Sequence, residues 1–549
     1  MTRWLKIVSA SLVFLAGTGF LAKDYVLLHL PGWLSPKVYE NRAVEWRQGP
    51  QDAALSVNRR PPNVILIMAD DLGYNDITLN GGGAAGGALK TPNIDALGLE
   101  GAIFSNGYAG NATCAPSRAA LMTGRYPTRF GFEFTPADVR FARTVAGFAT
   151  DWKYKTIFDE QAARTAPPPD DKGVPPGELT IAELMRARGY HTIHLGKWHL
   201  GGSEGMRPEH QGFDESLGFI IGAQMFLPEN DPQVVNSRQD FDPIDKYLWA
   251  NLPFSVQYNG SERFHPDRYM TDYLTEQALR AIRANRNQPF FLYLAYNAPH
   301  TPLQALKADY DALPQISDHR LRVYAAMIRA LDRGVGRVMD ELKAQGIDDN
   351  TLVIFTSDNG GAHYIGLPEI NHPYRGWKAT FFEGGTKVPY LMRWPGHIPA
   401  GVRLNGAVSH FDIFATAGAA AGTTVPDDRE MDGVDLLPYI RGDASGQPHT
   451  ALFWRSGGYR AVLNGGWKLH KVAQTKATML FNLDADLTER HDMAVAEPAK
   501  VAELEALLGG HDARSMAPAW PSLINAPIAV DRPLGTKPVD GETIIYWAN

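Results

Sequence analysis

Four short apolar segments of this chain are each followed directly by polar side chains that could do chemistry. These side chains are Asp70 and Asp71, Lys197 and His199, His300, and Asp358 and Asn359. Ligand sites in open α/β sheets lie beyond the carboxyl ends of the strands, so these groups would converge if the segments are parallel strands. Carboxylate and amide oxygens suit a hard cation such as calcium or magnesium, and histidine can transfer protons near neutral pH. No Cys and His cluster with zinc spacing is present.

Cys114 is the only cysteine among 549 residues, so no internal disulfide can form. A proline follows at position 116 and a glycine at 124, which predicts a helix that begins near Cys114. Helix N-termini present unpaired N–H groups and a positive dipole, which favour a bound anion. Taken alone, Cys114 could equally be an inert thiol that packs as a small hydrophobe.

The elements that must position these groups follow from the apolar pattern. Continuous apolar runs, which indicate strands buried on both faces, occupy residues 64–69, 192–195, 290–296 and 352–356. Helical patterns lie between them, at 181–188 and 324–342. This alternation predicts an α/β fold: a large domain with a mainly parallel, mixed sheet flanked by helices.

The pattern changes near residue 443. Short runs with turn signals at 451–455, 459–463, 467–472 and 479–483 predict a small antiparallel sheet, and residues 499–508 predict one helix after Pro498. We therefore divide the chain into a large domain, 60–443, and a small C-terminal α+β domain, 444–549. Two stretches without clear periodicity, 136–177 and 222–266, are interpreted as long loops that form walls of a substrate pocket.

Composition limits the class of partner. The chain has 53 basic and 60 acidic residues and a net charge of −7, which argues against nucleic acid or another polyanion as the main partner. A small anionic substrate stays compatible with this charge.

The N-terminus predicts export. Arg3 and Lys6 precede an apolar run at 7–22, and apolar residues resume at 25–34. Residues 1–35 are therefore interpreted as a signal peptide or an N-terminal membrane anchor, with a buried helix as the third possibility. Either of the first two places the protein in the periplasm or another extracytoplasmic space, with membrane association through residues 7–34 if the segment is retained.

The sequence resembles one known family. Cys114 begins a Cys-x-Pro-Ser-Arg motif that is followed by Thr-Gly-Arg at 123–125, which is similar to the signature of the type I, formylglycine-dependent sulfatases of the alkaline phosphatase superfamily. The likeness extends over about residues 63–394. Its further motifs are Asp70-Asp71-Leu72-Gly73, Thr91-Pro92-Asn93, Gly196-Lys197-Trp198-His199, Ala298-Pro299-His300, Ser357-Asp358-Asn359-Gly360 and Arg375-Gly376-Trp377-Lys378.

The resemblance implies a set of site residues. Asp70, Asp71, Asp358 and Asn359, with position 114, would bind one divalent cation, calcium or else magnesium. A formylglycine-generating enzyme would oxidise Cys114 to formylglycine, whose hydrate has one hydroxyl to attack sulfur and a second to expel sulfate. The implied catalytic residues are Arg118 for the hydrate, Lys197 and Lys378 for the sulfate oxygens, His300 with Lys378 for the leaving oxygen, and His199 for the elimination. Trp377, His363 and His372 are the candidates for the substrate pocket.

The implied function is hydrolysis of an aryl or carbohydrate sulfate ester, a small molecule or a glycan, to an alcohol and inorganic sulfate. The main alternative is a formylglycine-dependent phosphonate or phosphate ester hydrolase, which would share the same core residues. A two-metal phosphatase lacks support because the sequence shows no second set of Asp and His ligands. A sulfated-glycan binding protein with an inactive site and a hydrolase that uses the unmodified Cys114 thiol are the two less favoured interpretations.

Overall fold

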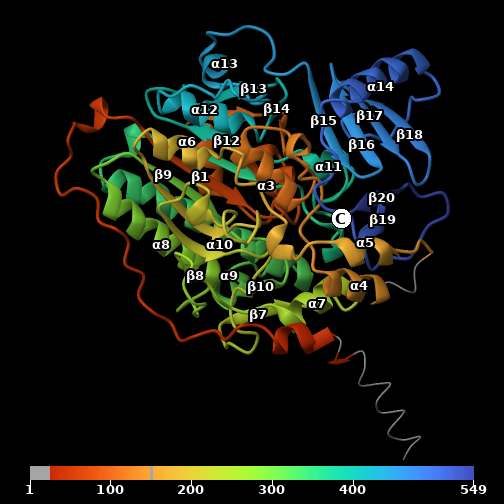
Figure 1. Cartoon of the computed structure of the whole chain (residues 1–549), viewed down its shortest axis with the longest axis horizontal. Coiled ribbons are helices and arrows are strands. Elements are labelled where there is room, and N and C mark those ends of the chain that lie inside the picture. The colour runs from red at the N-terminus through yellow and green to blue at the C-terminus, as the bar shows by residue number, and fades with distance from the viewer. Residues whose placement is uncertain (1–24, 27, 149–152) are drawn as a thin grey trace, which may run out of the picture.

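The computed structural model describes residues 25–26, 28–148 and 153–549. Its largest element is a nine-stranded mixed sheet in the order β13-β2-β12-β11-β1-β9-β5-β6-β8 (Figure 1). In that order the strands are Val402–Leu404, Ala102–Phe104, Tyr390–Arg393, Thr351–Ser357, Asn63–Ala69, Phe290–Ala295, His191–Lys197, Glu215–Phe219 and Gln257–Tyr258. The five strands from β11 to β6 are parallel, while β12 and β8 pair with them in the antiparallel direction. The predicted mainly parallel sheet is confirmed.

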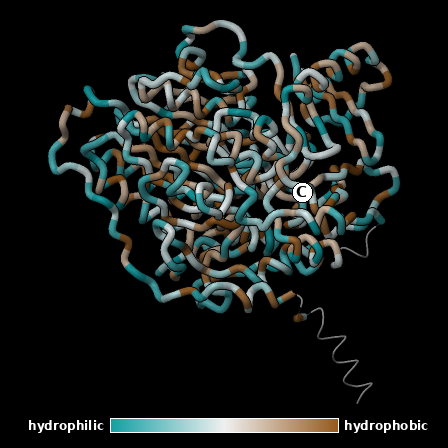
Figure 2. Tube along the Cα trace, in the orientation of Figure 1, coloured by the Kyte–Doolittle hydropathy of each residue, from teal (hydrophilic) through white to brown (hydrophobic). Residues whose placement is uncertain are grey.

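The central strand β1 shows why its apolar run is continuous. All seven of its residues are buried. Leu66 and Met68 belong to the hydrophobic core on one face of the sheet, whereas Ile65 and Ile67 belong to the core on the other face. Since successive side chains of a strand point to opposite faces, a strand covered on both sides needs apolar residues at every position. Figure 2 shows hydrophobic residues mainly in the interior and hydrophilic residues along the outer loops.

Two layers of helices cover the sheet (Figure 1). On one face lie α3 (Cys114–Thr123), α6 (Ile181–Ala187) and α12 (Asp412–Ala420), and on the other lie α2 (Pro92–Leu99), α8 (Met270–Asn285) and α10 (His319–Ala344). Thr180 and Glu183 form a capping box at the start of α6, and Asp318 accepts a hydrogen bond from the N–H of Leu321 at the start of α10. The helices predicted at 181–188 and 324–342 are therefore confirmed, as α6 and α10.

Smaller elements complete this part of the chain. Short strand pairs are β3 (Gly107–Tyr108) with β14 (Val408–Ser409), and β7 (Val234–Ser237) with β10 (Leu303–Leu306). Three short helices are α9 (Lys307–Asp311), α11 (Glu383–Thr386) and α13 (Leu437–Arg441).

The C-terminal part has a separate antiparallel sheet, as predicted. Its strands are β15 (Ala451–Ser456), β16 (Tyr459–Asn464), β17 (Trp467–Val472) and β18 (Ala477–Asn482), and α14 (Pro498–Asp512) packs on β16 and β17 (Figure 1). Leu504 and Leu508 of α14 join a small core with side chains of the sheet. The exact boundary at 443 stays a prediction.

A buried charge cluster ties this sheet to the larger unit. Lys468 of β17 donates a 2.8 Å hydrogen bond to Glu383 of α11, and both side chains have no exposed surface. Glu489 accepts from the Glu383 N–H at 2.7 Å and lies 3.6 Å from Lys468 Nζ. In addition, the Tyr459 hydroxyl accepts a hydrogen bond from the N–H of Phe381. The segment that follows Lys378 is therefore held by the C-terminal sheet.

The prediction of long loops at 136–177 and 222–266 is wrong in part. These stretches contain α4 (Val139–Phe148), β4 (Ile157–Phe158), α5 (Glu160–Thr165) and α7 (Pro243–Asn251). The Phe141 ring of α4 packs edge-on against Tyr247 of α7 at 5.0 Å, and β4 pairs with β19 (Ile524–Ala529), which pairs in turn with β20 (Ile544–Ala548). These elements are short and contact segments far away in the sequence, so local periodicity could not reveal them.

The N-terminal prediction falls mostly outside the described residues, because 1–24 and 27 are not among them. Among the residues that the structure does describe, no helix is long and apolar enough to cross a membrane. Asn251, at the end of α7, binds the segment 28–32 near the N-terminus. Its Oδ1 accepts a hydrogen bond from the Gly32 N–H at 2.6 Å, and its Nδ2 donates to the Leu28 carbonyl at 2.8 Å. The signal or anchor assignment stays a prediction.

Candidate active site

Cys114 is the first residue of α3, as the sequence predicts, and only 3% of its surface is exposed. The preceding Thr113 is extended, and Gly124 ends the helix with a φ of 68°, where its N–H donates to the Ala120 carbonyl. A residue with a side chain disfavours that left-handed conformation, so glycine fits this end of the helix. The Cys114 side chain consequently lies at the N-terminus of a fully buried helix.

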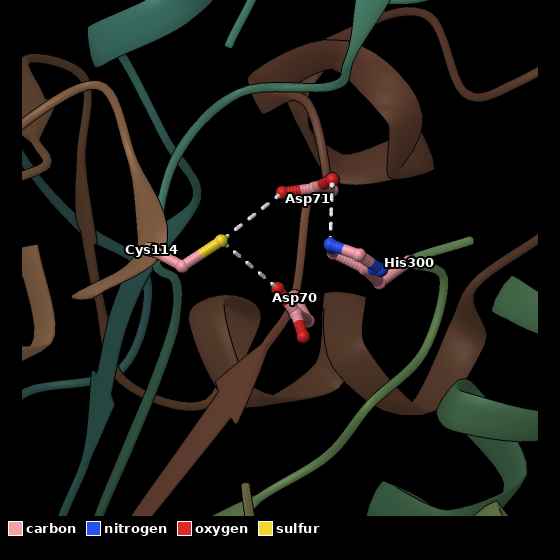
Figure 3. Close-up of side chains that lie close together, drawn as sticks. All are labelled: Asp70, Asp71, Cys114 and His300. Atoms are coloured by element: carbon pink, nitrogen blue, oxygen red, sulfur yellow. Dashed lines mark hydrogen bonds and ion pairs between the residues drawn. The ribbon is translucent and has the colours of Figure 1, made fainter. Parts of the chain in front are cut away.

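Three carboxylates meet beside Cys114. Strands β1 and β11 are adjacent and parallel, with Ala69 opposite Ser357, so Asp70, Asp71 and Asp358 emerge at the same edge of the sheet. Asp71 has a φ of 63° and its N–H donates to Asp358 Oδ1 at 3.1 Å. Cys114 Sγ lies 3.7 Å from Asp70 Oδ1 and 3.8 Å from Asp71 Oδ1 (Figure 3). The two consecutive aspartates therefore both face position 114.

Each of these carboxylates has a cationic partner. Arg118, one helical turn after Cys114, donates from Nε and Nη2 to Asp358 Oδ2 at 2.9 and 2.8 Å. Lys197 Nζ lies 2.7 Å from Asp70 Oδ2, and Lys378 Nζ lies 2.7 Å from Asp71 Oδ1. Burial, and then the Asp358 charge, raise the pKa of Asp70 well above its ordinary value, so the site holds three negative and three positive side chains when Asp70 is ionised. A bound dication would leave a net charge of about +2, which favours an anionic ester.

Lys378 lies on a loop whose backbone is hydrogen-bonded to two other segments of the site. Its N–H donates to the Gly361 carbonyl at 3.0 Å, and the next N–H, of Ala379, donates to the Ala112 carbonyl at 2.7 Å. Because Gly361 follows Asp358 closely and Ala112 precedes Cys114, these two bonds place Lys378 between the metal-ligand candidates and the nucleophile candidate.

Two histidines complete the group. His300 Nε2 lies 3.7 Å from Asp71 Oδ2 (Figure 3), and its Nδ1 is 2.5 Å from the Thr301 carbonyl, so Nδ1 carries the proton of that bond. His199 is 8% exposed, and its Nδ1 has no hydrogen-bond partner among the described residues. Burial lowers the pKa of both imidazoles, and for His199 the positive charge of Lys197 lowers the pKa further.

Burial also sets the ionisation of the other groups. Burial and then the Asp358 charge raise the pKa of the Cys114 thiol, so the thiol stays protonated and is a poor nucleophile near neutral pH. For Asp358, burial opposes ionisation, but Arg118 and then Lys197 lower its pKa far below the usual range. For Lys378, burial opposes the charged form, but Asp71 raises its pKa well above the ordinary value, so Lys378 stays protonated.

The donor set fits a hard divalent cation. Asp70, Asp71, Cys114 and His300 each offer one ligand atom, and these four atoms lie within 4.8 Å of one another. Asn359 Oδ1 is buried and has no hydrogen-bond partner in the described part of the chain, while Asn359 Nδ2 donates to Asp71 Oδ1 at 2.7 Å. Three buried carboxylates with an unpaired amide oxygen suit oxygen-preferring calcium or magnesium.

Comparison with known proteins identifies the family. The Sulfatase family profile matches residues 62–423, which is more than half of the chain. The chain belongs to the sulfatase family. It is therefore an enzyme, a sulfuric ester hydrolase, and its large sheet with a separate antiparallel C-terminal sheet is the fold of its structural neighbours.

Named relatives and solved structures are similar to most of this chain. N-acetylgalactosamine-6-sulfatase of Homo sapiens is 32% identical over 479 residues, which cover 80% of this chain and 82% of that protein. The crystal structure of Ps i-CgsB in complex with k-i-k-neocarrahexaose has a TM-score of 0.69 at 33% identity and covers 84% of this sulfatase and 95% of that chain. A phosphonate monoester hydrolase of Agrobacterium radiobacter has a TM-score of 0.57 at 20% identity, with coverage of 82% and 96%, and shows the fold alone.

The sulfatase site opens into a cavity of about 440 Å³. Cys114, His199, His300 and Lys378 line it, and so does His363, one of the three residues predicted for the pocket. The other two lie elsewhere: Trp377 is 5% exposed in the core, with its indole N–H donating to the Ala529 carbonyl at 3.2 Å, and His372 is exposed. Trp377 is adjacent to Lys378 in the sequence, but consecutive residues of a loop point in different directions, so of the two only Lys378 lines the cavity.

Two tyrosines at the site were not predicted. The Tyr293 hydroxyl accepts a hydrogen bond from Arg118 Nη1 at 3.1 Å, and the Tyr364 hydroxyl donates to Asp71 Oδ2 at 3.1 Å. Tyr293 lies inside an apolar strand, where it is indistinguishable in sequence from a core aromatic. Tyr364 follows the Asp358-Asn359-Gly360 motif closely, and that proximity is the one signal by which it could have been found.

Proposed function

We propose that this sulfatase hydrolyses an aryl or carbohydrate sulfate ester to an alcohol and inorganic sulfate, with formylglycine in place of Cys114 and one calcium ion. The observation that carries the proposal is the position of Cys114 at the start of α3, within 3.8 Å of the Asp70 and Asp71 carboxylates. We expect a formylglycine-generating enzyme to modify Cys114 during maturation.

The ionisation of Cys114 supports the modification. A thiol whose pKa is raised by burial and by the Asp358 charge would not supply a thiolate, so the unmodified side chain is a weak nucleophile. A formylglycine hydrate supplies one hydroxyl that attacks sulfur and a second whose deprotonation releases sulfate and restores the aldehyde.

The carboxylates and cations have separate tasks in this proposal. Asp70, Asp71, Asp358 and the Asn359 Oδ1 atom would hold the cation, which when bound polarises the nucleophile and a sulfate oxygen. Lys197 and Lys378 each hold one of the aspartates in the structure. With the cation bound they would neutralise the sulfate oxygens, and Arg118, which is fixed to Asp358, would hold the hydrate.

Proton transfer to the leaving oxygen falls to His300 and Lys378 together. Burial lowers the pKa of His300, whereas the Asp71 carboxylate keeps Lys378 protonated. At neutral pH Lys378 is therefore the group that holds the proton. His300 Nε2 would accept this proton from Lys378 and donate it to the leaving oxygen. The neutral imidazole of His199 would take the proton from the second hydroxyl as sulfate leaves.

We extend the proposal to the domains and the compartment. Residues 60–443 would form the catalytic domain and 444–549 the C-terminal domain, whose Ile524, Ile528 and Trp547 line the same cavity. Residues 1–35 would direct export, on the evidence of Arg3, Lys6 and the apolar run at 7–22.

The test compares one sequence made in two ways. The full chain is produced with and without a formylglycine-generating enzyme, and peptide mass spectrometry measures conversion at position 114. Release of sulfate from 4-nitrophenyl sulfate is expected only from converted protein, and Cys114→Ala should be inactive while its far-ultraviolet circular dichroism is unchanged. Full activity of unconverted protein would overturn the formylglycine proposal. A many-fold preference for phenyl phosphonate over the aryl sulfate would instead support the phosphonate hydrolase alternative.

A further inference from the structure

The walls of the active-site cavity are apolar over four separate parts of the chain. Large apolar side chains line it from α4 (Phe141, Val145), α7 (Ile244, Leu248), β19 (Ile528) and β20 (Trp547). The reacting groups Cys114, His300 and Lys378 line the same cavity. An ester whose sulfate meets these groups therefore has its leaving group against the apolar walls.

The charge of the lining restricts the number of anionic groups on the substrate. Among the described residues that line the cavity, Lys378 is the only lysine and no arginine is present. Lys378 is already paired with Asp71, and the described lining also includes the carboxyl groups of Asp138, Asp170 and Asp242. A second sulfate or a carboxylate on the substrate would enter without a cationic partner, which opposes its transfer from water. The lining therefore fits an ester with a single anionic group.

Most of the surface that lines the cavity is apolar, although polar side chains also line it: Ser35, Thr113, Thr135, Thr156, Tyr247, Asn251, Tyr364 and Asn549. These side chains contribute little polar surface, so a hydroxyl-rich leaving group would contact mainly apolar atoms. A buried hydroxyl that finds no hydrogen-bond partner loses its bonds to water, which opposes binding, whereas burial of apolar surface favours it. The cavity of about 440 Å³ is within the range of sites for drug-sized ligands. A bulky apolar alcohol therefore fits the cavity and can bury its apolar surface there.

Apolar surface continues from the cavity to the exterior. Pro31 and Ser35 line the cavity, and between them Trp33 and Leu34 expose 59% and 64% of their surfaces. Trp33 and Leu34 also belong to the apolar run at 25–34 that we interpret as part of a signal peptide or membrane anchor. Asn251 binds this segment to α7, so when residues 1–35 are retained as an anchor the exposed pair lies beside the cavity.

We propose that the physiological substrate is a monosulfate ester with a bulky, apolar leaving group, aryl, polycyclic or long-chained, so that of the two leaving-group classes in the proposed function the sugar is excluded. This inference rests on the proposed function and assigns the leaving group to the same site. It differs from what the name N-acetylgalactosamine-6-sulfatase would suggest, and it agrees with the name of another relative, the steryl-sulfatase of Rattus norvegicus, which is 30% identical over 495 residues. The wall residues Ile528 and Trp547 lie beyond the part that the family profile matches, 62–423, so the family match does not determine them.

The experiment uses the full chain with formylglycine at position 114. Its kcat/KM is measured for octyl sulfate, a sterol 3-sulfate and galactose 6-sulfate, with 4-nitrophenyl sulfate as a reference. Octyl sulfate and galactose 6-sulfate are both esters of primary alcohols, so their intrinsic reactivity is matched. We expect at least one of the two apolar esters to exceed galactose 6-sulfate by at least about tenfold. A value for galactose 6-sulfate equal to or above both would overturn the inference.

A matched pair of variants assigns the preference to the wall. Ile244 and Ile544 are both half-buried isoleucines, but only Ile244 lines the cavity. In Ile244→Asn the ratio of kcat/KM for octyl sulfate to that for galactose 6-sulfate should fall by about tenfold, while in Ile544→Asn it should not change. The fraction of folded enzyme cancels in this ratio, and an unchanged ratio in Ile244→Asn would contradict the proposed wall. Failure to hydrolyse 4-nitrophenyl sulfate would count against the proposed function instead.

Discussion

Replacement of Lys468 by methionine should strongly destabilise the protein. Lys468 lies on β17 with no exposed side-chain surface, and its Nζ is 2.8 Å from Glu383 and 3.6 Å from Glu489. Lys387 Nζ lies 3.5 Å from the other oxygen of Glu383. The cluster therefore has two carboxylates, two lysines and His470, which lies 3.2 Å from Glu489 and whose pKa is lowered by burial. Methionine keeps most of the volume but leaves one carboxylate charge without a partner.

The magnitude follows from that uncompensated charge. Removal of one partner of a buried ion pair costs about 3–5 kcal/mol, a large part of a typical unfolding free energy of about 5–15 kcal/mol. Burial alone would raise the pKa of Glu383, and Lys468 is the main group that lowers it. Without Lys468 the folded-state pKa of Glu383 rises, so protonation relieves the penalty. The loss of stability in Lys468→Met should then be larger at about pH 8 than at about pH 5.

The assay is urea unfolding followed by tryptophan fluorescence, with a control variant on the same strand. Lys471 also pairs with a glutamate, Glu505, but its side chain is 38% exposed. Lys471→Met should cost less than about 1 kcal/mol because exposed ion pairs contribute little. If Lys468→Met costs no more than Lys471→Met, or if its cost does not depend on pH, the buried cluster does not stabilise the contact between the two parts of the chain.

Three further predictions concern the metal, the proton donor and acid stability. Calcium at a hundredfold excess over its Kd should raise the unfolding free energy of chelator-treated protein by about 2.7 kcal/mol. Asp358→Asn should remove this rise. An equal rise in both proteins would refute the assigned site. His300→Gln should lower kcat for octyl sulfate by about 10²–10⁴, with a smaller loss for 4-nitrophenyl sulfate, whose leaving group needs no proton; equal losses would exclude proton donation. Burial lowers the pKa of His410 from 6.5 to about 3. The contribution of neutral His410 to the unfolding free energy is therefore complete above about pH 6.5. It is lost as the pH falls toward 3, at up to about 1.4 kcal/mol per pH unit. In urea unfolding at a series of pH values, the unfolding free energy of His410→Gln should therefore decrease less steeply toward acid pH than that of the parent protein.

The sequence predicted the core of the fold because the central strands are covered on both faces. Strands β1 and β11 appear in the sequence as continuous apolar runs, and each ends directly before its aspartates. The antiparallel strands β2 and β12 were not predicted, since they have three and four residues and depend on their neighbours for stability. The helices α4 and α7 were missed for a similar reason, because they pack on each other across about a hundred residues.

The sequence by itself determined which groups can react and at which strand and helix ends they lie. Asp70, Asp71 and Cys114 follow from local motifs and from the periodicity of the elements before them. Only the tertiary structure decided that Lys197 pairs with Asp70 and Lys378 with Asp71, and that burial keeps the thiol of Cys114 protonated. It also decided that the cavity walls are apolar and that Trp377 is not among them. The physical reason is that charge interactions and desolvation depend on distance and burial, which arise between segments hundreds of residues apart.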